Sequence, residues 1–126
     1  MNFPENLKYT KDHEWILVSG DIGTVGITEH AQGELGDVVF VELPAVGKSV
    51  KQHDSFGTIE AVKAVSDLYS PVTGSIIEVN KDLAAAPELV NKDPYGKGWM
   101  VKIKLTNPGE ISGLLDAATY KTLVAK

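Results

Sequence analysis

The sequence contains no cysteine and no arginine among its 126 residues. Without cysteine the chain has no disulfide, no thiolate nucleophile and no cysteine-ligated metal, so any thiol chemistry must come from a cofactor. All twelve basic residues are lysines, and acidic residues outnumber them to give a net charge of −5. Because arginine is the preferred residue for bidentate contacts with phosphate and guanine, nucleic-acid binding is not expected.

Long hydrophobic runs are also missing. No apolar segment approaches the roughly 18 residues that a membrane-spanning helix needs, so no membrane insertion is expected. The first residues, MNFPENLKYTKDHEW, show neither a secretion-signal core nor an Arg-rich transit pattern. We therefore expect a cytoplasmic, bacterial protein, or a mitochondrial matrix protein only if the chain is a processed form. The length and the 43% hydrophobic content fit one domain over residues 1–126.

Most of the chain has the pattern of short strands separated by Gly, Pro, Asn or Asp. The predicted strands are residues 14–19, 22–27, 37–43, 55–61, 66–70, 74–80 and 99–105. Helices are predicted at residues 28–35 with Thr28 as N-cap, as one short turn near 83–89, and at 116–125 with Asp116 as N-cap. The pattern predicts a small antiparallel β structure, a barrel or sandwich, with peripheral helices.

Few residues suggest catalysis. The three histidines, His13, His30 and His53, are not at the helical i, i+4 spacing of metal ligands, so no metal site is expected. Glu14 and Asp67 would form a pair of carboxyl groups suited to acid–base work only if the fold brings them together; taken singly, each fits a solvated charge. The sequence also lacks the Gly-x-Ser-x-Gly motif of serine hydrolases.

Lys63 is the most distinctive charged residue. It is the only basic residue between Lys51 and Lys81, a window that contains four acidic residues. Nearby anions favour the charged form of a lysine, which makes Lys63 a poor nucleophile in its own right. Its small apolar neighbours leave it accessible, so the pattern favours a lysine that another enzyme recognises and acylates over a catalytic one. A lysine on an exposed strand or turn with no special role is the alternative.

The segment IEAVKAVSDLYSPVTGSIIEVN around Lys63 resembles the lipoyl-lysine segment of the glycine cleavage system H-protein family. KYTKDHEWI, VGITEHAQGELGDVVFVELPAVG and LVNKDPYGKGWMVKIK also match the pattern of this family, in the same order. The resemblance covers the chain from about Leu7 to about Leu105. One departure is Ala61, where the family often has Ser, and this puts any hydroxyl contact with the modifying enzyme in doubt.

This resemblance implies a mainly β fold, a lipoyl/biotinyl-type barrel-sandwich hybrid with a few short peripheral helices and a C-terminal helix. It places Lys63 at the tip of a β-hairpin, with lipoate in amide linkage on an arm that reaches about 12 Å. It implies a groove for the loaded arm, with Glu14 and Asp67 as candidate residues and His30 as a weaker one. Glu60 is implied in recognition by the modifying enzyme.

The same resemblance implies a non-catalytic carrier and its partners. The carrier takes the aminomethyl group of glycine from the decarboxylase (P protein) to the aminomethyltransferase (T protein), and reducing equivalents to dihydrolipoyl dehydrogenase (L protein). A lipoate–protein ligase or octanoyltransferase would attach the cofactor, and the carrier is expected to be a monomer.

Four alternatives compete with this interpretation. A biotinyl domain typically has methionines beside its lysine, whereas Val62 and Ala64 flank Lys63 here. A lipoyl domain of a 2-oxoacid dehydrogenase would be shorter and would lack the DPYGKGWM segment. An H-like relay that donates lipoyl groups to other complexes, and a plain binding module without cofactor, remain open from the sequence.

Overall fold

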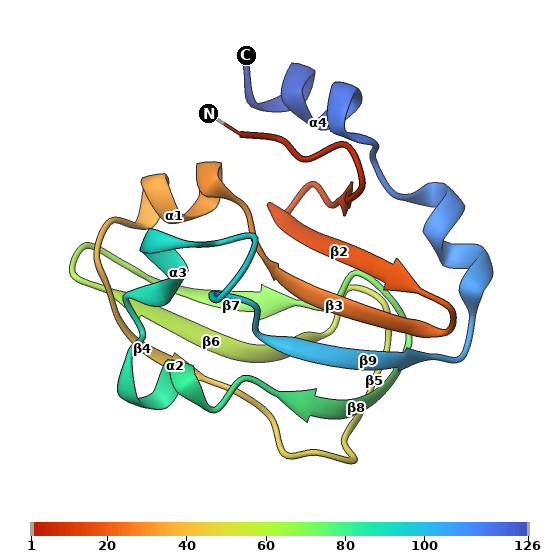
Figure 1. Cartoon of the computed structure of the whole chain (residues 1–126), viewed down its shortest axis with the longest axis horizontal. Helices are drawn as coiled ribbons and strands as arrows, with labels where there is room; N and C mark the ends of the chain where they lie inside the picture. The colour runs from red at the N-terminus through yellow and green to blue at the C-terminus, as the bar shows by residue number, and fades with distance from the viewer. Residues whose placement is uncertain (1, 126) are drawn as a thin grey trace.

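Two antiparallel sheets form the centre of the protein in the computed structural model, which describes residues 2–125 (Figure 1). The six-stranded sheet has the order β1-β2-β3-β9-β8-β5, and the three-stranded sheet has the order β4-β6-β7. The strands of the larger sheet are β1 (Lys8–Tyr9), β2 (Glu14–Ser19), β3 (Ile22–Ile27), β9 (Val101–Leu105), β8 (Gly74–Val79) and β5 (Ser49–Val50). Those of the smaller sheet are β4 (Val38–Glu42), β6 (Ser55–Ala61) and β7 (Val65–Tyr69).

Alternating burial explains how the two sheets enclose one core. In β6, Ile59 is buried while its neighbour Glu60 is exposed, and in β8 the buried Ile76 is followed by exposed residues. The inward side chains of both sheets form one hydrophobic cluster that includes Ile16, Val25 and Leu68. The arrangement confirms the predicted mainly β fold, although the two sheets remain separate and do not close into one barrel.

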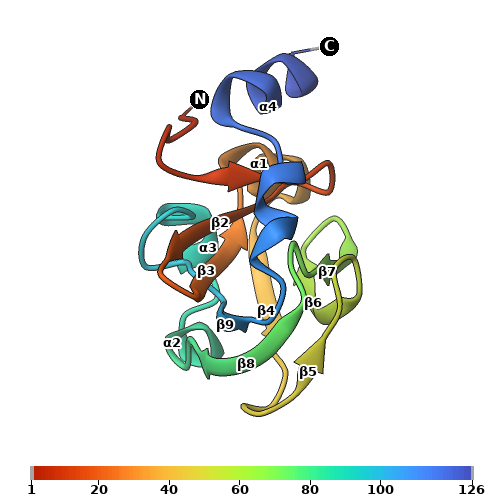
Figure 2. The same cartoon turned by 90° about the vertical axis from the view of Figure 1, so that its right-hand side faces the viewer.

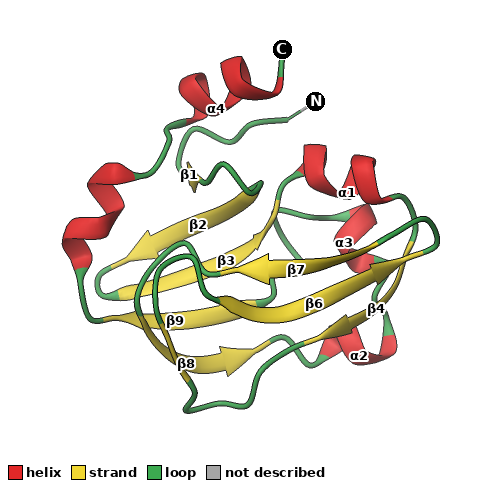
Figure 3. Ribbon diagram, turned by 180° about the vertical axis from the view of Figure 1, so that it is seen from behind, coloured by secondary structure: helices red, strands yellow, loops and turns green. Residues whose placement is uncertain are grey.

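The short helices lie at the periphery of the sheets (Figures 1 and 3). They are α1 (Glu29–Leu35), α2 (Asp82–Ala85), α3 (Leu89–Lys92), the 3-10 helix η1 (Pro108–Gly113) and α4 (Ala117–Val124). Both predicted N-caps are confirmed, because Thr28 Oγ1 accepts from Ala31 N–H and Asp116 Oδ1 accepts from Thr119 N–H. The short helical turn predicted near residues 83–89 corresponds to α2, whereas the second helix, α3, which follows Pro87, was not predicted.

The sequence prediction also missed three elements, β1, β5 and η1. The two strands are only two residues long, too short to show an alternating pattern, and η1 has the Pro and Gly content of a loop. A hairpin joins β2 and β3, the strands predicted at residues 14–19 and 22–27. Its turn contains Gly20, whose φ of 63° lies in the left-handed region that glycine adopts without strain.

A second, smaller core joins the two ends of the chain. The ring of Tyr120 on α4 stacks on Tyr9 with a centroid distance of 4.7 Å and meets Phe3 edge-on at 5.8 Å. Trp15 and Leu7 belong to the same cluster. The N-terminal segment and α4 therefore lie side by side at one end of the molecule (Figures 1 and 2).

Candidate functional site

Lys63 lies in the turn between β6 and β7, which extends past the neighbouring strands beside α1 (Figure 3). The hairpin closes with a hydrogen bond of 2.8 Å from Ala61 N–H to the carbonyl of Ala64. A second bond of 2.9 Å runs from Val62 N–H to the carbonyl of Asp37, in the loop after α1. Lys63 is exposed, so the fold holds the turn in place while leaving the side chain accessible.

Gly36 shapes the path of the Lys63 side chain. It follows α1 as the C-cap with a φ of 81°, and a Cβ added there would lie 2.8 Å from Lys63 Cε. The positive φ favours glycine, whereas the end of the flexible Lys63 side chain could move away from an added Cβ. Leu35, the preceding residue, lines a cavity of about 160 Å³ beside the hairpin. The side chain of Lys63 therefore lies against the residue that follows α1, next to a residue that lines this open cavity.

This cavity brings together residues from three parts of the chain. Glu14 at the start of β2, Asp67 on β7, and Ala31, Glu34 and Leu35 on α1 all line it. Asp67 is four residues from Lys63 along extended chain, a distance of roughly 13 Å at most. The structure thus brings two of the predicted groove residues, Glu14 and Asp67, to the same cavity.

Glu14 lies deep in this cavity with only 2% of its surface exposed. Its Oε1 accepts a hydrogen bond of 2.7 Å from the Thr10 hydroxyl, and its Oε2 accepts one of 3.3 Å from Tyr69 N–H. Burial raises the pKa of Glu14 to about 8, and these two hydrogen bonds only partly offset that rise. Glu14 is therefore mostly protonated at neutral pH, ready to become a carboxylate if a cation enters.

Asp67 occupies a different position from Glu14. It is exposed and pairs with Thr58 of β6 at the edge strand of the smaller sheet, so it marks the rim of the cavity. His30 lies outside this cavity and lines a neighbouring one, with its Nε2 3.5 Å from Glu34 Oε1. The structure therefore places Glu14 and Asp67 at the same cavity and places His30 at the neighbouring one.

His13 lines both cavities, and the sequence analysis did not select it. Its Nδ1 lies 2.9 Å from the Tyr120 hydroxyl, and its ring centroid lies 4.7 Å from that of His30. Burial and the neighbouring His30 lower the pKa of His13, so the ring is neutral at pH 7. The adjacent Glu14 in the DHEW segment was the only signal in the sequence, because the partner Tyr120 is 107 residues away.

The comparisons with known proteins agree with each other. The model of the family described as glycine cleavage H-protein matches residues 7–126. The glycine cleavage system H protein of Symbiobacterium thermophilum is 60% identical over 119 residues, covering 94% of this chain and 93% of that protein. That of Staphylococcus carnosus is 52% identical over the whole of both chains. A crystal structure of the Mycobacterium marinum protein has a TM-score of 0.89 at 40% identity, covering 98% and 99% of the two chains.

The chain belongs to the glycine cleavage H-protein family. This confirms the resemblance inferred from the sequence. Membership of the H-protein family makes the chain a non-catalytic carrier in glycine cleavage, and a family of this kind implies a lipoyl group on a lysine. The biotinyl and 2-oxoacid dehydrogenase alternatives are not supported by these relatives.

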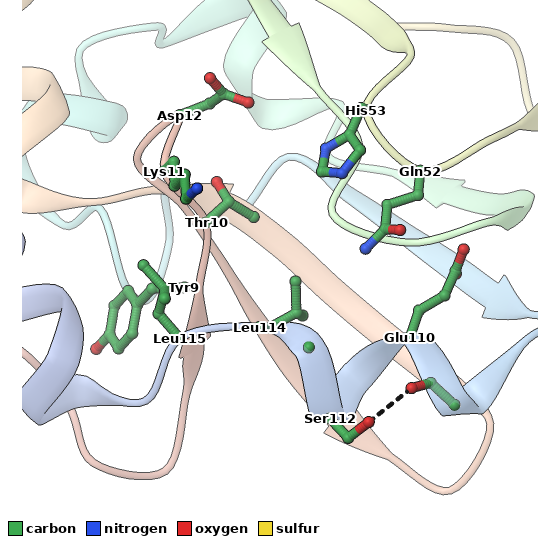
Figure 4. Close-up of a pocket in the computed structure, with 12 residues that line it drawn as sticks. Tyr9, Thr10, Lys11, Asp12, Gln52, His53, Glu110, Ser112, Leu114 and Leu115 are labelled. Carbon is green, nitrogen blue, oxygen red and sulfur yellow. Dashed lines mark hydrogen bonds between the residues drawn. The ribbon is translucent and has the colours of Figure 1, made fainter.

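A larger cavity of about 600 Å³ has no part in this H-protein site. It lies between the N-terminal segment, residues 52–53 and η1, and it includes neither Lys63 nor Glu14 (Figure 4). The two oxygens of its Glu110 already accept hydrogen bonds of 2.7 Å each from the backbone and hydroxyl of Thr73. Its carboxylate is therefore engaged in holding η1 against the chain before β8, a structural role.

The part of the chain that the structure describes offers neither a metal-ligand cluster nor a membrane-spanning helix. Among residues 2–125, no group of three His, Asp or Glu side chains is arranged to hold a metal ion. Over the same residues, no helix is long and apolar enough to cross a bilayer.

Proposed function

We propose that Lys63 is the attachment residue for lipoate in this carrier. The observation that carries the proposal is the placement of one exposed lysine in an anchored turn, with its side chain against Gly36 and next to a cavity that contains a buried carboxyl group. Lys63 does not itself line the cavity, but its side chain approaches Gly36, which follows the cavity-lining Leu35. Lys48, in the turn before β5, has no such approach to Gly36.

The residues around the cavity fit such a group. A volume of about 160 Å³ is room for about five water-sized groups, since one water occupies about 30 Å³ of liquid. Gly36 keeps the approach open, and Ile27, Ile59 and Leu68 give the cavity an apolar wall. When bound, lipoate supplies a dithiolane that accepts electrons and carries a small group, which this cysteine-free chain has no means to do alone.

Glu14 and Asp67 would then hold a cationic cargo on the arm. The protonated amine of an aminomethyl group needs a carboxylate once water is excluded, because an unpaired charge is costly in an apolar site. Glu14 offers one at the base of the cavity, and Asp67 offers one at its rim. His30 would act on the cargo only indirectly, through His13. The His13 ring lines the cavity, and its centroid lies 4.7 Å from that of His30.

Membership of the glycine cleavage system implies the decarboxylase, aminomethyltransferase and dihydrolipoyl dehydrogenase as partners. We propose further that a lipoate–protein ligase or octanoyltransferase modifies Lys63 and recognises Glu60, three residues before it. We also propose that residues 1–126 act as one domain, as a monomer, in the cytoplasm.

Intact-mass and peptide mass spectrometry test the attachment site. Protein isolated from lipoate-replete cells is expected to carry one lipoyl adduct, localised to Lys63. The adduct should be absent from Lys63→Arg and present in the control Lys48→Arg, which keeps the charge at an exposed turn lysine. An adduct that persists in Lys63→Arg, or none in the unsubstituted protein, would overturn the proposal.

The groove assignment has its own test. In the loaded carrier, Glu14→Gln and Asp67→Asn should each hasten the spontaneous loss of the aminomethyl cargo. Glu5→Gln, at an exposed residue outside the cavity, is the control. Unchanged decay in both variants would remove the groove role while leaving Lys63 as the attachment residue.

A further inference from the structure

Large apolar side chains are exposed around the Lys63 turn. Val62 in the turn is 72% exposed, and Val65 at the start of β7 is 68% exposed. On β4, Val39 is 54% and Phe40 is 48% exposed. Single exposed apolar residues are ordinary, but a group gathered at one place marks an interaction surface.

Strand pairing places part of this group on one face of the smaller sheet. Phe40 pairs with Glu60, and Glu60 pairs with Val65, so the three side chains form one row across β4, β6 and β7. Two residues further along, and therefore on the same face, lies a second row: Glu42, Thr58 and Asp67. Because β7 is the edge strand of the smaller sheet, Asp67 belongs to this row and also lines the rim of the cavity. We call these two rows the outer face of the smaller sheet.

The outer face is acidic. Its two rows carry three carboxyl groups beside two large apolar side chains, and strands β4, β6 and β7, all of them described, contain no lysine. A surface that complements it has an apolar depression flanked by lysine or arginine side chains. Such charges also speed the encounter of the two proteins.

The reach of the side chain indicates which partner uses this face. An enzyme that attaches the cofactor must bring its own active site to Lys63 Nζ, roughly 6 Å from the backbone. An enzyme that uses the finished arm meets its far end, about 12 Å from the backbone, and can bind at a distance from the turn. The surface immediately around the turn is therefore suited to the attaching enzyme.

We propose that the outer face of the smaller sheet is the docking surface for the enzyme that acylates Lys63. This inference rests on the proposed attachment at Lys63. The docked enzyme transfers the acyl group from an acyl adenylate. The Nζ ammonium first loses one proton, the neutral amine forms an amide bond with the acyl carbon as the bond from that carbon to AMP breaks, and Nζ then loses a second proton. The enzyme surface presents an apolar depression to Phe40 and Val65, with basic side chains toward Glu42 and Glu60.

The test measures acylation of purified, unmodified protein by a lipoate–protein ligase with lipoate and ATP, followed by intact mass. Val65→Lys and Phe40→Lys are each expected to lower kcat/KM at least tenfold. The control Val46→Lys changes a residue that is 60% exposed in the loop after β4 and should stay within twofold of the unsubstituted protein. Circular dichroism and thermal unfolding verify that each variant is folded.

Two charge-reversal variants separate the electrostatic contribution to docking from the apolar one. Glu42→Lys is expected to lower kcat/KM about tenfold at low ionic strength, and the loss should shrink at 0.5 M salt, where the Debye length is about 4 Å. The control Glu5→Lys makes the same charge change at an exposed residue of the N-terminal segment, away from the outer face, and should have little effect.

The outcomes distinguish this inference from the attachment site. If the two apolar variants are acylated at the normal rate while Lys63→Arg is not, the docking surface is wrong and the attachment residue stands. If the unsubstituted protein is not acylated at Lys63, the attachment proposal itself fails. A dimer of the unsubstituted protein that Val65→Lys dissociates would assign the outer face to a second copy and overturn the inference.

Discussion

Glu14→Gln gives the sharpest test of the buried carboxyl group. Glu14 is 2% exposed, and burial raises its pKa from an ordinary value of 4.5 to about 8. Glutamine has nearly the same shape and no titratable proton. It therefore imitates the protonated carboxyl group at every pH, and its main structural change is one amide nitrogen in place of an accepting oxygen, worth about 1 kcal/mol.

The magnitude follows from the proton balance. Between pH 4.5 and about 8 the unfolded chain has lost the Glu14 proton while the folded protein keeps it. The free energy of unfolding therefore falls as the pH rises through this window, by about 1.4 kcal/mol per pH unit from this one group. The two pKa values differ by about 3.5, which amounts to about 5 kcal/mol once the pH exceeds 8.

Urea unfolding at pH 5, 6, 7 and 8, followed by tryptophan fluorescence, measures this effect. At pH 5 the variant and the unsubstituted protein should agree within about 1 kcal/mol. At pH 8 the variant should be more stable by about 3 kcal/mol. In the unsubstituted protein, folding requires Glu14 either to take up a proton or to bury a charge, and glutamine requires neither. A difference that stays constant from pH 5 to 8 would refute the reasoning. Glu60→Gln, at an exposed position, provides the control.

Two further predictions concern a buried hydrogen bond and the space around two glycines. Tyr120→Phe removes a hydroxyl that bonds Thr28 Oγ1 at 2.7 Å, and we expect a loss of about 1–3 kcal/mol in the free energy of unfolding; a change below about 0.5 kcal/mol in urea titrations would contradict this. Gly57→Ala would place a Cβ in a steric clash with the Glu42 carbonyl oxygen and should cost roughly 2 kcal/mol or more. Gly33→Ala, where a Cβ meets nothing within 4 Å, should instead stabilise α1 by up to about 1 kcal/mol, so equal thermal shifts in the two variants would be inconsistent with these contacts.

Local sequence signals were sufficient for much of the fold. Alternating apolar residues predicted the longer strands within one or two residues, and β6 was predicted with its observed bounds, residues 55–61. Thr28 and Asp116 each precede a helical pattern, and both act as N-caps. These features succeed because they depend on neighbouring residues and the backbone groups next to them.

The turn at Lys63 could not be predicted from local chemistry. The segment EAVKAV contains none of the Gly, Pro, Asn or Asp residues that favour turns, so the hairpin came from the family resemblance alone. In the structure, the carbonyl of Asp37 holds the turn through Val62 N–H. This contact joins residues 25 positions apart, and no local pattern reports it.

The depth of Glu14 was equally inaccessible from sequence. The segment DHEW suggests a polar surface, but Tyr69, 55 residues away, donates to this carboxyl group and helps to enclose it. His13 was passed over because its partner Tyr120 lies on the last helix. A groove residue is recognised by what surrounds it, and those surroundings come from distant parts of the chain.

The strand order has a consequence for the newly made chain. The smaller sheet uses only residues 38–69, so its strands can begin to pair once that segment leaves the ribosome, before the larger sheet covers their inner side chains. The larger sheet must wait, because β9 (residues 101–105) lies between β3 and β8. His13 lines the cavity and is held by Tyr120 on the last helix, so this side of the cavity is completed last. We expect the lysine and its outer face to be ready for an acylating enzyme before the cavity beside them is complete.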